Sequence, residues 1–283
     1  MRASTPDDYA SGLAFGCHPV HTKLATQAFV SFAAFQDINM LITSELADKG
    51  ILHEIDQMGV YVAQEWSEGE PVNSTLDKLY VKYPELQEAC GEAIVQAFDM
   101  LRQSYRQGGK TLLCGNGGSA ADCEHIVGEL MKGFLLRRPI PADFRAKLGK
   151  IDGESADYIA DSLQGALPAI SLVSHTALST AFANDMAPDL VFAQQVYGYG
   201  KPGDVLIGIS TSGNSSNVLH ALRVAKAADL RTIGLTGSSG GRMKELCDVT
   251  ICVPYEQTPD IQERHLPIYH ALCILLEKEF FGS

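Results

Sequence analysis

Five short apolar runs alternate with helix-forming segments through most of the chain. The runs span 111–114, 169–174, 205–210, 232–236 and 249–253. Helices are expected over about 85–107, 120–132, 177–185, 189–198, 215–228, 240–246 and 260–280. Short β-branched strands that alternate with helices are typical of a parallel sheet covered on both faces. The sequence therefore predicts an α/β fold with a doubly wound parallel sheet, in which ligands bind at the carboxyl ends of the strands.

Composition narrows the classes of function. The chain has 283 residues and a formal net charge of −12, which argues against a broad nucleic-acid-binding surface. Its seven cysteines are scattered without a CxxC pair, so neither a thiolate zinc site nor a disulfide framework is expected. The N-terminus lacks a signal-peptide pattern, and no apolar run reaches the roughly 18 residues of a membrane helix. We expect a cytoplasmic protein with no membrane or nucleic-acid partner.

The N-terminal part differs from the rest in its hydrophobic pattern. Between residues 22 and 65 apolar residues recur at helical spacing, with a break at Lys49-Gly50. Gly69-Glu70-Pro71 then forms a predicted linker. We expect a partly helical extension over residues 1–70 and one domain over 71–283, interrupted by an insertion at about 134–165.

The first candidate site is the turn Cys114-Gly115-Asn116-Gly117-Gly118-Ser119. Glycines let the backbone approach a ligand closely, and the N-terminus of the following helix favours an anion. His125 and Glu129 stand four residues apart in that helix and share one face. Such a pair is more often solvated surface than metal ligand, so the turn alone decides neither a phosphate site nor a metal site.

A second turn combines the same elements with more hydroxyl groups. Ser210-Thr211-Ser212-Gly213-Asn214-Ser215 follows a predicted strand and precedes a predicted helix. Its hydroxyls and backbone N–H groups favour an anion without a lysine, so it is the better candidate for binding phosphate. Neither turn has the P-loop lysine or the GxGxxG pattern with a following acidic residue, which disfavours nucleotide hydrolysis and NAD.

Taken together and in order, five blocks resemble the sugar isomerase (SIS) family. They are Gly115-Asn-Gly-Gly-Ser119, His125-xxx-Glu129, Asn184-Asp185, Ser210-Thr-Ser-Gly-Asn-Ser215, and Ile261-Gln262-Glu263 with His270. Within that family the chain is similar to the phosphoheptose isomerases, over about residues 85–280. The resemblance implies a flavodoxin-like three-layer sandwich and an aldose–ketose isomerase that converts sedoheptulose 7-phosphate to D-glycero-D-manno-heptose 7-phosphate through an enediol. It also implies a homotetramer with sites between subunits.

The resemblance further implies one zinc ion per subunit, held by His125, Glu129, Gln262 and His270. A shell of imidazole, carboxylate and amide donors suits zinc and leaves it able to act as a Lewis acid. Glu129 is then the candidate base at C1 and C2, and His270 the acid or base at the sugar oxygens. The implied substrate contacts are Asn116, Gly117, Gly118, Glu129, Asn184, Asp185, Ser210, Thr211, Ser212, Ser215 and Gln262.

The spacing of Gln262 and His270 conflicts with a shared metal. Eight residues of continuous helix place their α-carbons roughly 12 Å apart along the axis. Three solutions are open: the helix begins after Gln262, Pro267 distorts it, or the two side chains come from different subunits. By spacing alone His265 pairs better with Gln262, whereas the resemblance points to His270.

Two further points keep other functions open. The family commonly has a basic residue just after a glycine at the end of the first helix, whereas here Lys132 precedes Gly133, so a different phosphoketose is an alternative substrate. The main rival is a non-catalytic SIS-domain regulator that binds a replication initiator protein or senses phosphosugars. The presence of Glu129 and His270 favours the enzyme. A deaminating isomerase would have two such domains in tandem, and only one is present.

Overall fold

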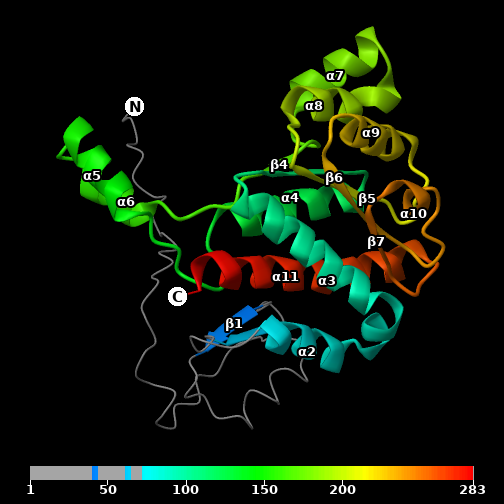
Figure 1. Ribbon diagram of the computed structural model, residues 1–283, viewed down its shortest axis with the longest axis horizontal. Coiled ribbons are helices and arrows are strands. Elements are labelled where there is room, and N and C mark those ends of the chain that lie inside the picture. The colour runs from blue at the N-terminus through cyan, green and yellow to red at the C-terminus, as the bar shows by residue number, and fades with distance from the viewer. Residues whose placement is uncertain (1–39, 44–60, 65–71, 283) are drawn as a thin grey trace, which may run out of the picture. The chain divides into compact units, whose positions relative to one another are not determined.

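The computed structural model describes residues 40–43, 61–64 and 72–282 (Figure 1). The chain divides into two compact units, 1–66 and 67–283. In the first unit, strands β1 (Met40–Thr43) and β2 (Tyr61–Gln64) pair in parallel.

The prediction of helix is wrong for these two strands. Both are short apolar runs with β-branched or aromatic residues, and periodicity alone does not separate strand from helix in such runs. The other residues of that predicted helix, and the predicted linker at 69–71, lie outside the described residues.

The second unit begins with two helices, α2 (Val72–Lys82) and α3 (Pro84–Arg106), and continues as alternating strands and helices. The strands are β3 (Thr111–Gly115), β4 (Ala169–Ser171), β5 (Val205–Ile209), β6 (Arg231–Thr236) and β7 (Val249–Cys252). The helices are α4 (Gly118–Met131), α5 (Ala142–Ile151), α6 (Ala156–Ser162), α7 (Thr176–Asp185), α8 (Val191–Tyr199), α9 (Ser216–Ala227), α10 (Met243–Leu246) and α11 (Thr258–Phe281), with a 3₁₀ turn η2 (Pro188–Leu190) before α8. The sequence predicted the five strands and helices α3, α4 and α7 to α11, but neither α2 nor η2, and α5 and α6 lie within the predicted insertion.

The five strands form one parallel sheet in the order β4-β3-β5-β6-β7. Counted along this unit the order is 2-1-3-4-5, which is that of the flavodoxin-like doubly wound folds. One face of the sheet packs against α3, α4 and α11, and the other against α8, α9 and α10. The predicted three-layer α/β architecture is confirmed.

This topology fixes where a ligand binds. The strand order reverses between β3 and β5, and the crevice beyond the carboxyl ends of such a strand pair is the usual ligand site. Gly115 at the end of β3 is in register with Ile209 at the end of β5. The two candidate turns, 115–119 and 210–215, therefore leave the sheet side by side at the switch point.

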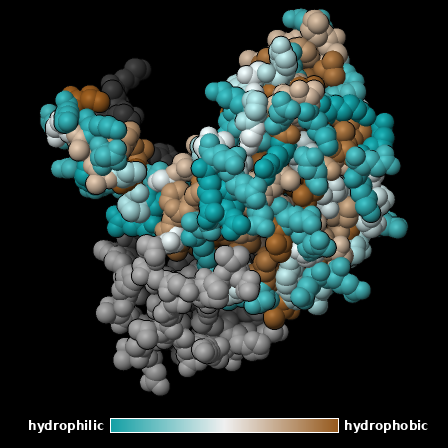
Figure 2. All heavy atoms as spheres, in the orientation of Figure 1, coloured by the Kyte–Doolittle hydropathy of each residue, from teal (hydrophilic) through white to brown (hydrophobic). Residues whose placement is uncertain are grey.

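Helices α5 and α6 occupy the predicted insertion and form an arm that projects from the rest of the unit (Figure 1). Its two ends are joined by a bridge between Pro139 and Gln164 and by the hydrogen bond from Gly165 N to Arg138 O, 2.7 Å long. No residue of α5 is buried, and Figure 2 shows hydrophobic patches on this otherwise mostly hydrophilic projection. Because the arm leaves and returns at one point, it interrupts the sequence without interrupting the sheet.

None of the helices in the described ranges combines the length and hydropathy required to cross a lipid bilayer.

Candidate active site

The two turns at the switch point are joined to each other, and we call them the loop site. Asn116 and Asn217 exchange side-chain amide hydrogen bonds of 3.0 and 2.9 Å, which ties the first turn to the start of α9. Gly118 begins α4 directly beneath the Gln262 amide, so any side chain at Gly118 would collide with it. Asn116, Gly118 and Gln262 thus lie at one edge of the sheet.

The second turn is held in place by backbone hydrogen bonds from the chain beyond β6: Gly237 N donates to Thr211 O at 3.0 Å, and Met243 N donates to Gly213 O at 3.1 Å. Its hydroxyls converge, with Ser210 Oγ 2.9 Å from Ser215 Oγ at the start of α9. Gly213 has φ = +63°, and a Cβ there would strike the backbone at Gly240, so the turn requires glycine. A hydroxyl-rich turn at a helix N-terminus provides what a phosphate group needs.

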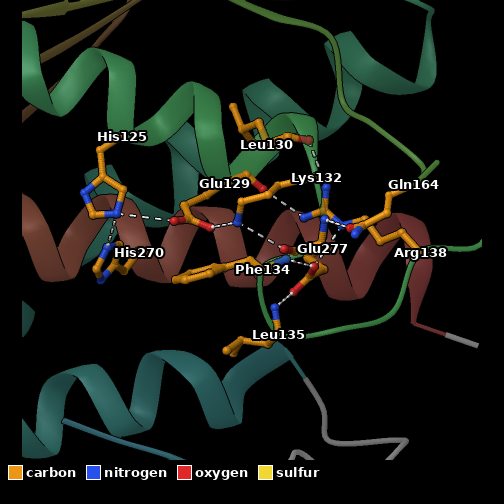
Figure 3. A network of polar contacts seen from close by, with 11 residues as sticks. His125, Glu129, Leu130, Lys132, Phe134, Leu135, Arg138, Gln164, His270 and Glu277 are labelled. Carbon is orange, nitrogen blue, oxygen red and sulfur yellow. Dashed lines mark hydrogen bonds and ion pairs between the residues drawn. The ribbon is translucent and has the colours of Figure 1, made fainter. Parts of the chain in front are cut away.

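A second group of side chains lies further along α4, where that helix packs against α11. His125 Nε2 is 3.3 Å from Glu129 Oε1 and 3.3 Å from His270 Nε2 (Figure 3). Glu129 is largely buried, with 12% of its side chain exposed, whereas 41% of His125 is exposed. The structure therefore brings together three of the four predicted metal ligands, and we call them the histidine cluster.

Tyr269, which is itself bonded to Asp122, orients the His125 ring by contacting its Nδ1 atom. The Tyr269 hydroxyl donates to Asp122 Oδ1 at 3.2 Å and lies 3.1 Å from His125 Nδ1. Burial raises the pKa of Tyr269, with a further contribution from Asp122, so the hydroxyl keeps its proton. Because that single proton goes to Asp122, His125 must donate its Nδ1–H to Tyr269. Nε2 of His125 is then the atom presented to Glu129 and His270.

The two histidines of α11 differ in position. Burial, with a smaller effect of His125, lowers the pKa of His270 to about 4, so its ring is neutral at neutral pH and available as a ligand or proton acceptor. Burial also lowers the pKa of His265 to about 4. The His265 ring is fully buried, with Nε2 3.4 Å from the Thr236 carbonyl oxygen. His270, not His265, contacts His125.

The remaining predicted residues are not all brought together. Helix α11 is continuous from Thr258 to Phe281, so it begins before Gln262 and is not broken at Pro267. Gln262 lies against Gly118, seven residues and about 10 Å along α4 from His125. Asn184 and Asp185 are exposed at the end of α7, where the Asn184 amide donates to Asp185 at 2.8 Å.

The donor atoms of the histidine cluster suit zinc. Ligand atoms about 2.0–2.1 Å from a tetrahedral zinc lie about 3.3–3.4 Å from each other, which matches both distances at His125. Unprotonated nitrogen and carboxylate oxygen repel at such distances unless a proton or cation lies between them. Within the described part of the chain, however, no group of three or more His, Cys, Asp or Glu side chains could hold a metal ion. The donor types suit zinc, but within the described residues of one chain they do not make a metal site.

Several residues with a place in this site were not predicted from the sequence. Asp122 stands three residues before His125 on the same helix, so helical spacing was a usable signal for it. Asn217 and Tyr269 gave no such signal, because their partners lie more than 100 residues away. Lys132, whose Nζ is 3.4 Å from Glu129 Oε2, places a positive charge next to the candidate base.

Comparison with known sequences is consistent with this geometry. The family model of the SIS domain matches residues 77–146 and 163–237, with a gap inside the α5–α6 arm. The phosphoheptose isomerase of Rhodospirillum rubrum is 42% identical over 188 residues, which cover 66% of this chain and 86% of the relative. That of a Nitratiruptor species is 47% identical over 171 residues, covering 60% and 78%.

Solved structures give the same result. The structure of phosphoheptose isomerase from Neisseria gonorrhoeae has a TM-score of 0.56 and 34% identity, and the match covers 73% of this chain and 97% of that one. The Francisella tularensis phosphoheptose isomerase has a TM-score of 0.58 and 30% identity, with 73% and 96% covered.

Proposed function

This chain belongs to the SIS domain family, and from that premise we propose that it is an aldose–ketose isomerase that converts sedoheptulose 7-phosphate to D-glycero-D-manno-heptose 7-phosphate. The observation that carries the proposal is the meeting of His125, Glu129 and His270 where α4 packs on α11. The rival, a non-catalytic regulator, does not require this cluster.

The reaction needs a base that moves a proton between C1 and C2 of the sugar. Glu129 is suited to this role because it is mostly buried yet opens toward His125, so its carboxylate is little solvated. Neutral His270 exchanges protons with the O1 and O2 hydroxyls as the enediol forms, through the ring nitrogen that does not face His125. Lys132, beside Glu129, adds positive charge close to the developing negative charge.

The loop site holds the other end of the substrate. In this proposal the Ser210, Thr211, Ser212 and Ser215 hydroxyls bind the phosphate, and Asn116 to Gly118 with Asn184 and Asp185 contact sugar hydroxyls. Phosphate binding remote from the reacting carbons positions them against the base.

The proposed metal is zinc, one per subunit, held by His125, Glu129, His270 and Gln262, and it would supply Lewis acidity toward the enediolate. Because Gln262 lies at the other end of α4 from the histidine cluster of its own chain, we propose that a second copy supplies it. The sites would then lie between subunits, in the homotetramer that we propose; the proposed location is the cytoplasm.

The test is conversion of sedoheptulose 7-phosphate by the purified, zinc-loaded protein, followed by NMR of the aldose product. Glu129→Gln is expected to lower kcat on the order of 10²- to 10⁴-fold, because it removes the base. Glu88→Gln on the exposed face of α3 is the matched control and should leave kcat unchanged. Absence of aldose with the native protein would exclude the proposed reaction.

A further inference from the structure

Next to the histidine cluster lies a fully buried ion pair that the proposed reaction does not use. Arg138 Nε donates to Glu277 Oε1 at 2.8 Å, and neither side chain has any exposed surface. Desolvating two charges costs free energy that attraction alone often fails to recover. A buried ion pair is therefore weak evidence for a gain in stability, and its geometry indicates what else it does.

The other hydrogen bonds of Arg138 and Glu277 go to backbone groups at and just after the C-terminal end of α4 (Figure 3). Arg138 donates to the carbonyl oxygens of Leu130 at 2.8 Å and Glu129 at 3.0 Å. Glu277 accepts the backbone N–H groups of Phe134 and Leu135, both at 2.7 Å. The segment between the end of α4 and Arg138 is therefore a loop whose two ends are held by one ion pair.

This arrangement fixes the helix end that carries the candidate base. The last carbonyl groups of a helix lack partners within the helix and attract positive charge. Arg138 satisfies two of them, including the carbonyl of Glu129 itself. The guanidinium also lies 4.7 Å from the centre of the Phe281 ring, which holds its plane.

The ion pair also contacts the face of α11 that carries His270, because Glu277 lies on that face. Glu277 follows His270 by seven residues, two turns of α11, so both point toward α4 from nearly the same face. Phe134, whose backbone is held by Glu277, places its ring 5.4 Å from the ring of His270. The ion pair thus connects the backbone of Glu129 with the surroundings of His270.

We propose that Arg138 and Glu277 are positioning residues, which set the separation and rotation of α4 against α11 so that His270 on α11 meets His125, beside Glu129, on α4. The inference rests on the proposed function for its kinetic consequence, but its structural content stands without it. The backbone carbonyl oxygen of Arg138 also accepts the bond from Gly165, so the pair lies where the α5–α6 arm returns to the rest of the unit.

The test compares Arg138→Lys with native protein. Lysine keeps the charge but loses the planar fork, so it cannot serve both carbonyl groups and Glu277 at once. For the folded protein we expect kcat to fall on the order of 10- to 100-fold with KM little changed, as for a small misplacement of reacting groups. Arg145→Lys, in the exposed pair with Asp157 on the arm, is the control and should behave as native.

A second readout is independent of activity. In the metal-free protein the side-chain NMR signals of His270 carry ring-current shifts from Phe134 and His125, whose ring centres lie 5.4 and 4.9 Å away. Arg138→Lys and Glu277→Gln should both move these signals, and Arg145→Lys should not. If either variant folds with native kcat and unmoved His270 signals, positioning is excluded, whatever happens to the melting temperature.

The two readouts separate this inference from the proposed function. If the native protein produces no aldose, the proposed function fails, and the NMR comparison still decides whether the pair positions His270. If the native protein is active and Arg138→Lys loses only melting temperature, the pair is structural and the inference fails while the function stands.

Discussion

The loop site and the histidine cluster differ in chemistry and in the way they are built. The loop site consists of hydroxyls, amides and backbone N–H groups, and its side chains already bond each other, as Asn116 does with Asn217. The histidine cluster consists of imidazole and carboxylate groups, which can exchange protons, and His270 joins His125 and Glu129 only because α4 packs on α11. One region is suited to recognising a substrate and the other to transforming it.

The distance between the two regions also has a consequence. Gly118 and His125 are both on α4, about 10 Å apart along its axis. Helix α11 runs beside it, with Gln262 at the loop site and His270 in the cluster. Within one chain, a ligand that contacted both regions would have to span about this distance.

The largest expected effect tests whether the histidine cluster of one chain and Gln262 of a second chain form one active site. His125→Ala and Gln262→Ala should each lower activity by more than about 100-fold if both bind the catalytic metal. Refolding the two inactive variants together should restore activity, because about a quarter of randomly mixed shared sites contain both native residues. A mixture that stays inactive while forming mixed oligomers would place the whole site within one chain.

The next largest expected effect is the pH dependence of folding stability that His265 causes. This residue lies on α11, which also carries Gln262 of the loop site and His270 of the cluster. Its folded pKa of about 4 lies below the usual 6.5, so the unfolded chain binds more protons between these values. Stability is therefore full above pH 6.5 and falls as the pH drops toward 4, by about 3 kcal/mol from this residue. Chemical denaturation at several pH values should show a flatter profile for His265→Phe than for native protein. Equal slopes would contradict the assignment.

Tyr269→Phe tests the support of the histidine cluster without touching the loop site. Losing the hydroxyl frees His125 to rotate and change tautomer, so zinc affinity should fall about 10- to 100-fold in competition with a chelator. Tyr105→Phe is the matched control, because it removes another buried hydroxyl, the one that accepts the bond from Thr111 at 2.8 Å. Zinc affinity should be native in that variant. Equal losses in both would indicate a general loss of packing.

The smallest expected effect is on the loop site. Ser210→Ala with Ser215→Ala removes two hydroxyls from the proposed phosphate site, so KM should rise about tenfold while kcat changes less. Ser162→Ala, on the exposed arm, is the control and should leave both constants unchanged. Should kcat fall instead of KM rising, the second turn would belong to the chemistry, and the division between the two regions would be lost.

The sequence predicted the architecture because its signals are local. Alternation of short β-branched runs with helical periodicity predicts a parallel sheet, and glycine and serine after β3 and β5 predict turns at strand ends. His125 and Glu129 share a face by helical spacing alone. The same reasoning was wrong at β1 and β2, where the runs are too short for periodicity to separate strand from helix.

Only the tertiary structure decided which polar groups meet. It showed that α11 is continuous through Gln262 and His270. It also showed that His265 contacts the Thr236 carbonyl oxygen at the end of β6 and that Tyr269 contacts His125 Nδ1. It also buried Arg138 against Glu277, 139 residues further along the chain. Periodicity determines the face on which a side chain lies, whereas its partner depends on how distant helices pack. The sequence by itself therefore determined the elements and half of the candidate ligands, and helix packing decided the contacts that make them a site.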